Sequence, residues 1–208
     1  MRLRHGRHAS PASLGSLASA AWLVALAACL LVGCPGGPGA DGPHRALPPY
    51  TGHATELFDD AIDPQSVGLE LEGARNPKGD PILRERTQVA DAVVRVRITT
   101  VTGKQEDSGP TYHLGFRVVD QITGPHPPTT EFTIRLAPRV PAIGIVRSFE
   151  DRLVTMKVTF LMFLRGFARP DDPDGEMHFH LSRDSKEVLA AIMEAATLGE
   201  INSSGSPK

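Results

Sequence analysis

The chain has 208 residues, of which 40% are hydrophobic and 22% are charged, as is usual for a globular protein. This length favours one domain, because single domains usually contain roughly 100–200 residues, and the composition argues against a disordered chain or a polytopic membrane protein. After residue 33 the chain carries 19 Lys and Arg against 24 Asp and Glu, so no basic surplus points to a nucleic-acid partner.

Residues 1–33 have the organisation of an export signal. Arg2, Arg4 and Arg7 form a basic start, and an uncharged apolar run follows over residues 20–32. As a helix this run would span about 20 Å at 1.5 Å per residue, which is too short for a stable transmembrane helix of roughly 20 residues. The sequence therefore predicts a signal that is cleaved.

The end of this run, Leu31–Cys34, resembles the lipobox of bacterial lipoproteins. Leu31, Val32 and Gly33 match its apolar and small positions, and Cys34 occupies its invariant cysteine. The resemblance covers residues 1–34 and implies that Cys34 receives a diacylglycerol, that the signal is cut just before it, and that the new amine is acylated. Several acyl chains hold a protein on membrane lipid more firmly than one chain does.

The same resemblance implies a place in the cell envelope, and in the outer membrane if the source is Gram-negative, because Pro35 rather than Asp follows the cysteine. Two other interpretations stay open. In one, Cys34 is an ordinary apolar residue of an uncleaved signal anchor, as Cys29 would be. In the other, an ordinary signal peptidase releases a soluble periplasmic protein.

Residues 34–52 are expected to form a flexible tether, because Gly and Pro dominate them. A single β-rich domain is expected over residues 53–199, and a disordered tail over 200–208. Both cysteines precede this domain, so no disulfide can stabilise it. At its start the sequence predicts a short helix within residues 53–62, an edge strand over 66–72 and a loop over 73–81.

Alternation of apolar and polar residues is the main signal in the rest of the domain. It predicts strands over residues 92–101, 111–119, 131–137, 153–164 and 176–181. Residues 160–164 are apolar on both faces, which is typical of a central strand that is covered on both sides. We expect a small antiparallel barrel or sandwich, and the hairpins with one ancillary helix resemble OB-like barrels in strand count.

One helix is predicted to follow the last strand and to cover the second face of the central strand. Asp184 and Glu187 have the spacing of a capping box at its start. An apolar stripe follows at helical spacing. Its members are Val188, Leu189, Ile192, Met193 and Ala196.

His178 and His180 are the first candidate site, because residues two apart on a strand project from the same face. They could share a metal with a carboxylate from the neighbouring loop, which contains Asp171, Asp172, Asp174 and Glu176. The alternation, however, predicts that both histidines lie on the solvent face, and no metalloenzyme spacing such as H-E-x-x-H occurs. We therefore expect no metal and no cofactor, and a metal-dependent hydrolase is the alternative function.

A basic strand face is the second candidate site, for an anionic partner. If the strands pair in order, five basic side chains emerge on the face away from the core, and arginine suits carboxylate and phosphate groups. These side chains are Arg95, Arg97, Arg117, Arg135 and Lys157. The partner would be an anionic envelope polymer, a lipid headgroup or an envelope protein, whereas cross-strand pairing with acids such as Glu131 would give the same pattern.

The sequence contains no nucleophile elbow, P-loop, dinucleotide fingerprint or Cys/His catalytic arrangement. It therefore favours a non-catalytic protein. The prediction is a lipid-anchored envelope lipoprotein whose β-rich domain binds or supports another component.

Overall fold

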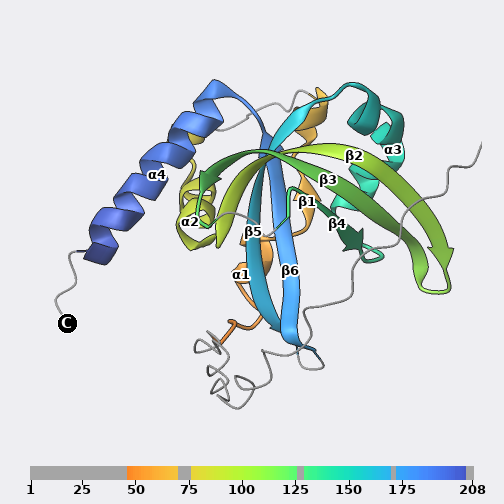
Figure 1. Cartoon of the computed structure of the whole chain (residues 1–208), viewed down its shortest axis with the longest axis horizontal. Helices are drawn as coiled ribbons and strands as arrows, with labels where there is room; N and C mark the ends of the chain where they lie inside the picture. Colours follow the sequence, from red (N-terminus) through yellow and green to blue (C-terminus); the bar gives the residue numbers. More distant parts are fainter. Residues whose placement is uncertain (1–45, 70–75, 126–128, 170–171, 205–208) are drawn as a thin grey trace, which may run out of the picture. The chain divides into compact units, whose positions relative to one another are not determined.

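The computed structural model describes residues 46–69, 76–125, 129–169 and 172–204. The predicted signal, the lipobox and Cys34 lie outside these residues. The described part is mainly β, with one mixed sheet and helices on both of its faces (Figure 1). The strands of this sheet are β1 (Ala61–Ile62), β2 (Ala92–Glu106), β3 (Gly109–Thr123), β4 (Glu131–Leu136), β5 (Thr159–Arg169) and β6 (Asp172–Arg183).

The order of the strands in the sheet is β1-β6-β5-β2-β3-β4. The pair β1 and β6 is parallel, and all other neighbours are antiparallel. Long strands β2 and β3 form a hairpin whose turn has two residues between Glu106 and Gly109. The sheet curves strongly (Figure 1), but it does not close, because β1 and β4 remain its edges.

Mainly β structure with a C-terminal helix on the sheet is confirmed, whereas the barrel and the sandwich are wrong. The polypeptide forms one open sheet instead of a closed cylinder or two stacked sheets. Three bulges in the β2–β3 pair, between Val93 and Val94, Arg95 and Val96, and Ile98 and Thr100, interrupt the simple alternation. Bulges bend a strand and increase its twist, which fits a sheet that curls without closing.

Strand β5 lies in the interior of the sheet, as its apolar sequence predicts, and Phe160–Leu164 are buried. Because side chains alternate along a strand, Phe160 and Met162 enter one core while Leu161 and Phe163 enter another. Burying a side chain of this size contributes roughly 1.5–3 kcal/mol. The two faces of one strand thus hold two cores together.

The helices are α1 (Ala54–Leu57), α2 (Pro81–Val89), α3 (Ala142–Thr155) and α4 (Lys186–Ser204), with 3-10 turns η1 (Pro64–Val67) and η2 (Pro77–Gly79). Helix α3 supplies Val146 and Leu153 to the core that contains Phe160. Helix α4 supplies Ala191 and Ile192 to the core that contains Phe163, which confirms that it covers the second face of β5. Among the described helices, none has the length and apolarity needed to cross a membrane.

Several predicted elements differ from the structure. The strand predicted over 153–164 begins only at Thr159, because residues 153–155 end α3 and Lys157 lies in the turn that follows. The edge strand predicted over 66–72 begins in η1, which ends at Gly68 with φ 83°, and residues 70–72 lie outside the described residues. The sequence pattern predicted neither a helix nor a strand for the residues that form α2. Asp80 caps this helix by accepting a hydrogen bond from Ile82 N at 3.0 Å.

The folded domain is longer at both ends than the sequence predicts. Residues 47–50, placed in the tether, pack on it: Ala168 N donates to Pro48 O at 2.8 Å, and Tyr50 contacts Phe167. At the other end α4 continues to Ser204, into the segment predicted as a disordered tail. Met193 of the predicted apolar stripe is 49% exposed instead of buried.

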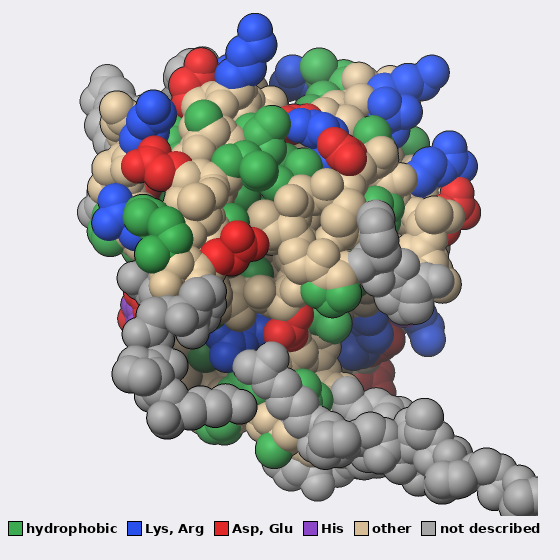
Figure 2. All heavy atoms as spheres, turned by 60° about the vertical axis from the view of Figure 1, so that its left-hand side comes forward, with side chains coloured by type: hydrophobic (Ala, Val, Ile, Leu, Met, Phe, Trp, Pro, Cys, Tyr) green, Lys and Arg blue, Asp and Glu red, His purple; other side chains and the backbone are tan. Residues whose placement is uncertain are grey.

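Figure 2 shows the side of the domain that carries α4, which is the left-hand side of Figure 1. Hydrophobic side chains gather near the middle of this face, and Lys, Arg, Asp and Glu surround them. Helix α4 contributes three exposed large hydrophobic residues in the described part of the chain: Met193, Leu198 and Ile201. Each of these three side chains has a large part of its surface exposed in the described structure.

Candidate functional site

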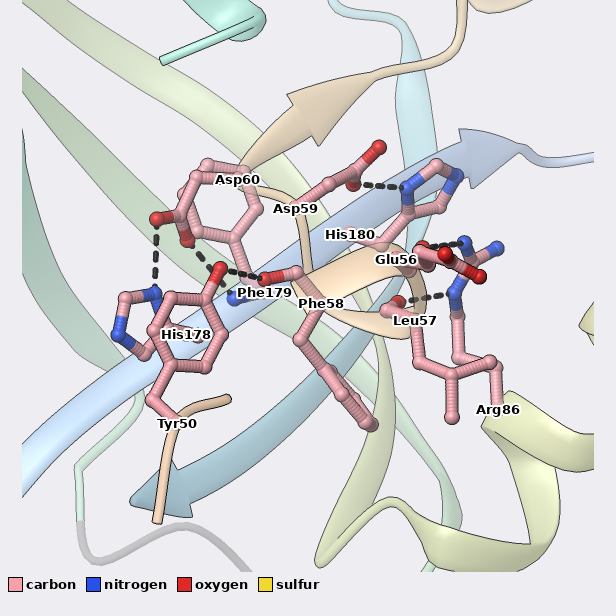
Figure 3. A network of polar contacts seen from close by, with 10 residues as sticks. All are labelled: Tyr50, Glu56, Leu57, Phe58, Asp59, Asp60, Arg86, His178, Phe179 and His180. Carbon is pink, nitrogen blue, oxygen red and sulfur yellow. Dashed lines mark hydrogen bonds and ion pairs between the residues drawn. The ribbon is translucent and has the colours of Figure 1, made fainter. Parts of the chain in front are cut away.

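Asp60, which directly precedes β1, makes the largest set of hydrogen bonds in the candidate site (Figure 3). Its carboxylate accepts from His178 Nδ1 at 2.8 Å through one oxygen and from Phe179 N at 3.1 Å through the other. Its backbone N–H donates to Phe179 O at 2.9 Å, and its carbonyl accepts from Ala142 N at 3.1 Å. Asp60 therefore joins β6 to the start of α3.

The backbone of Asp60 is left-handed, with φ 50°. Asp and Asn adopt this conformation more readily than most non-glycine residues. The neighbouring side chains of Asp59 and Asp60 consequently reach two different histidines (Figure 3). Asp59 Oδ1 accepts from His180 Nδ1 at 2.8 Å, so each histidine on β6 has a carboxylate of its own.

Both histidines are shielded from solvent, which corrects the prediction of a solvent-exposed face. The side chain of His178 is 10% exposed and that of His180 is 14% exposed. They are buried because α1 and the chain that leads into β1 cover this end of β6, as Figure 3 shows. The alternation of apolar and polar residues does not show that another segment of the chain packs over the polar face of a strand.

Burial and the neighbouring charges shift the pKa values of the Asp59–His180 pair. Burial lowers the pKa of His180, and the hydrogen bond to Asp59 does not reverse this. Burial raises the pKa of Asp59, but the hydrogen bond from His180 and the charges of His180 and Arg86 outweigh it, so the pKa of Asp59 lies below its usual value. At neutral pH the pair is an imidazole that donates to a carboxylate.

Arg86 of α2 is buried beside this pair and holds α1 in place. Its Nε donates to Leu57 O, and its Nη2 donates to Glu56 O at 3.4 Å. Its guanidinium also lies 5.7 Å from the centre of the Phe163 ring. These contacts satisfy carbonyl groups at the end of a helix of only four residues.

Tyr50 covers His178, the other of the two histidines on β6. Its ring stacks on His178 with centroids 3.5 Å apart and an interplanar angle of 11°, and its hydroxyl donates to Phe58 O at 2.5 Å. Burial and the charges of Asp60, Asp59 and Glu176 raise the pKa of Tyr50 to about 12. The hydroxyl therefore stays protonated and acts as a donor.

A cavity of about 550 Å³ opens beside His178, Tyr50 and Asp60. A volume of this size is in the range of small-molecule sites. Because Nδ1 of His178 donates to Asp60, its other ring nitrogen points away from that carboxylate (Figure 3). In the tautomer that donates from Nδ1, the other ring nitrogen is a hydrogen-bond acceptor.

The hydroxyl groups of the described cavity lining belong to Tyr50 and Thr55, and both are engaged elsewhere. Thr55 Oγ1 donates to Gly52 O at 2.8 Å, just as Tyr50 donates to Phe58 O. Neither hydroxyl is placed to give its proton to His178, so the geometry does not form a nucleophile and base pair.

The described residues do not supply a set of metal ligands for the alternative function, a metal-dependent hydrolase. No group of three or more His, Cys, Asp and Glu side chains in this part of the chain is arranged to hold a metal ion. The partners of His178 and His180 are Asp60 and Asp59, not acids of the 171–176 loop. Of the loop acids, Glu176 lines the cavity, while Asp171 lies outside the described residues.

The predicted basic face is paired with acids in the structure. Arg95 binds Asp120 at 2.9 Å and Asp184 at 2.8 Å, Arg117 binds Glu131 at 2.8 Å, and Arg135 binds Glu106 at 2.8 Å. Arg97 lies opposite Arg117 in the register of β2 and β3, whereas Lys157 is on no strand. The structure thus brings four of the five residues onto strands, mostly as ion pairs, and anion binding there stays a prediction.

Sequence reasoning missed Tyr50, Asp59, Asp60 and Arg86. One signal was present, because Tyr50 is one of only two tyrosines and stands inside a Gly/Pro-rich segment. The pairing of consecutive aspartates with histidines about 120 residues later depends on strand order, which the sequence pattern does not specify. In the comparisons with known proteins, no protein-family model matches the chain, and the search of curated proteins found no match.

Proposed function

We propose that this protein is a lipid-anchored bacterial envelope lipoprotein, and that its β-rich domain binds or supports another envelope component without catalysis. The observation that carries the anchor is the sequence Leu31–Cys34 between a basic, apolar export signal and a Gly/Pro-rich segment. In bacterial lipoproteins this arrangement directs acylation of the cysteine. If the source is Gram-negative, we expect the outer membrane.

The arrangement of the domain agrees with such an anchor. Residues 47–50 pack on the domain, and residues 35–46 of the sequence separate them from Cys34. Twelve residues span at most roughly 40 Å when extended. Acylation of Cys34 would therefore keep the domain close to the lipid surface.

Two observations support binding over catalysis. The cavity beside His178 has the size of a small-molecule site, and the hydroxyl groups of its described lining are held by backbone carbonyls. A hydroxyl that donates to a backbone carbonyl is not paired with His178 as an activated nucleophile would be.

Growth of cells with a labelled fatty acid tests the anchor. We expect the wild-type protein to be labelled and Cys34→Ala to be unlabelled. Cys29→Ala is the matched control, because it removes the other thiol of the same segment and should remain labelled. Label on Cys34→Ala, or a native protein whose mass still includes residues 1–33, would contradict the proposal.

A further inference from the structure

The cavity beside His178 lies where the two edges of the open sheet approach each other. Its lining combines residues from the β6 side, such as Glu176 and His178, with residues 134–141 of β4 and the following loop. Ala142 N donates to Asp60 O at 3.1 Å, so the chain after β4 reaches the start of β1. The cavity is therefore formed by segments from opposite ends of the strand order.

Charges of opposite sign lie on the two sides of this cavity. The β1 and β6 side carries Asp59, Asp60 and Glu176, whereas the β4 side carries Arg135 and Arg139. Asp59 and Asp60 are paired with histidines, and Arg135 is paired with Glu106. Within the described part of the chain, the side chains of Glu176 and Arg139 form neither an ion pair nor a hydrogen bond.

The backbone at Arg139 is left-handed, with φ 77°. For a long side chain this conformation is unfavourable by roughly 1–2 kcal/mol, and strained residues cluster at ligand sites. Burial raises the pKa of Tyr50, and the charges of Asp60, Asp59 and Glu176 raise it further, in keeping with the negative charges on that wall. The cavity is thus polarised from one wall to the other.

We propose that this cavity binds a small zwitterion, such as an amino acid or a short peptide with free termini. Glu176 receives the ammonium group and Arg139 receives the carboxylate. His178, oriented by Asp60, offers its free ring nitrogen to the bound molecule, and Ile134, Val140 and Met177 contact its apolar part. A volume of about 550 Å³ is large enough for a dipeptide.

The dipeptide alanyl-alanine tests this proposal, because each of its charges can be removed separately. The free dipeptide, its N-acetylated form, its amide and the doubly blocked form are titrated by calorimetry into the full chain purified from membranes. We expect the free dipeptide to bind at least tenfold more tightly than either singly blocked form, since each blocked end loses a charge-assisted hydrogen bond.

Two variants locate the binding. Arg139→Gln should weaken the free dipeptide about tenfold and remove its advantage over the amide, and Glu176→Gln should remove its advantage over the N-acetylated form. Arg147→Gln and Glu150→Gln are matched controls, because these residues of α3 are exposed and do not line the cavity. The two control variants should keep the wild-type affinity for the dipeptide. All four variants should keep the circular dichroism spectrum of the wild type.

Absence of binding up to about 10 mM dipeptide, equal affinity for the four forms, or unchanged selectivity in Arg139→Gln and Glu176→Gln would overturn the proposal. The test is independent of the anchor. Cys34→Ala should bind the dipeptide as the wild type does, so loss of acylation and loss of zwitterion binding are separate outcomes.

Discussion

The Asp59–His180 pair places two ionisable side chains in a position where little water reaches them. Burial disfavours the charged form of an imidazole, and here it lowers the pKa of His180 even beside a carboxylate. The folded protein therefore takes up a proton at His180 less readily than the unfolded chain does. This difference makes folding stability depend on pH.

We predict that the free energy of unfolding falls as the pH drops below about 6.5, the pKa of an unperturbed histidine. Below that value the unfolded chain is protonated at His180 while the folded state is not, until the pH reaches the lower folded pKa. The slope for one proton is at most about 1.4 kcal/mol per pH unit. Urea unfolding between about pH 7 and pH 5 should show a smaller fall in His180→Gln than in the wild type.

His53 provides a control of opposite sign. Hydrogen bonds to Glu85 and Glu56 raise the pKa of His53, so its contribution is complete below about pH 6.5 and is lost as the pH rises through the higher folded value. In His53→Gln the free energy of unfolding should therefore still fall below pH 6.5. The pKa of Asp59 is lowered, so its contribution is lost only below about pH 3.8, outside this range. An equal fall in wild type and His180→Gln would contradict the assignment.

At the scale of elements, the sequence predicted most of the strands and the helices α1 and α4, but it missed α2 and α3. Strands β2, β3 and β4 lie where period-two segments occur, because each has one face in the core and one toward polar surroundings. Helix α3 was missed, since residues 153–158 continue the alternation although residues 153–155 are helical. Helix α2 had a usable signal, Asp80 before Pro81, which is typical of a helix start.

The start of α4 shows how a correct element can have a wrong local detail. The sequence places Asp184 as its cap, but Asp184 Oδ2 accepts from Arg95 Nε at 2.8 Å and from Thr159 Oγ1 at 2.6 Å. Ser185 Oγ caps the helix instead, because it accepts from Val188 N at 3.2 Å. The choice depends on β2 and β5, which local spacing does not include.

We predict that Ser185→Ala lowers the free energy of unfolding by about 1 kcal/mol, the usual cost of losing an N-cap. This loss should add to that of Arg95→Ala within about 0.5 kcal/mol, because the two side chains do not interact. Asp184→Ala should instead couple with Arg95→Ala by about 1–2 kcal/mol, as expected for a hydrogen-bonded ion pair. Urea unfolding of the single and double variants measures the additivity of Ser185 and Arg95 and the coupling of Asp184 and Arg95.

An additive Asp184 and Arg95 pair, or a coupled Ser185 and Arg95 pair, would contradict this assignment of contacts. Thr159→Val is an informative companion, because Thr159 donates to the same Asp184 oxygen. It should leave the effect of Ser185→Ala unchanged.

At the scale of the whole molecule, the sequence predicted the β class but not the open sheet. Closure depends on which strands form the edges, and the parallel β1–β6 pair joins residues about 120 positions apart. The candidate cavity is a consequence of this topology, because it lies where β4 and its loop approach the β6 side. The histidine pair, Glu176 and Arg135 could be selected from the sequence, but Asp59, Asp60 and Arg139 could not, because only the topology brings them to the cavity.

The proposed processing changes the composition of the whole molecule in a way that can be measured. Trp22 is the only tryptophan of the chain and lies before Cys34. Cleavage just before Cys34 therefore leaves Tyr50 and Tyr112 as the tyrosines and removes all tryptophan. We predict that protein isolated from membranes emits tyrosine fluorescence without tryptophan fluorescence.

The Cys34→Ala variant separates lipoprotein processing from ordinary secretion. In the lipoprotein family the signal is cut only at the modified cysteine, so Cys34→Ala should retain Trp22 and its emission, while Cys29→Ala should lose it as the wild type does. An ordinary signal peptidase would remove Trp22 from all three proteins. Absence of tryptophan emission from Cys34→Ala would thus favour a soluble periplasmic protein, and tryptophan emission from the native protein would favour an uncleaved anchor.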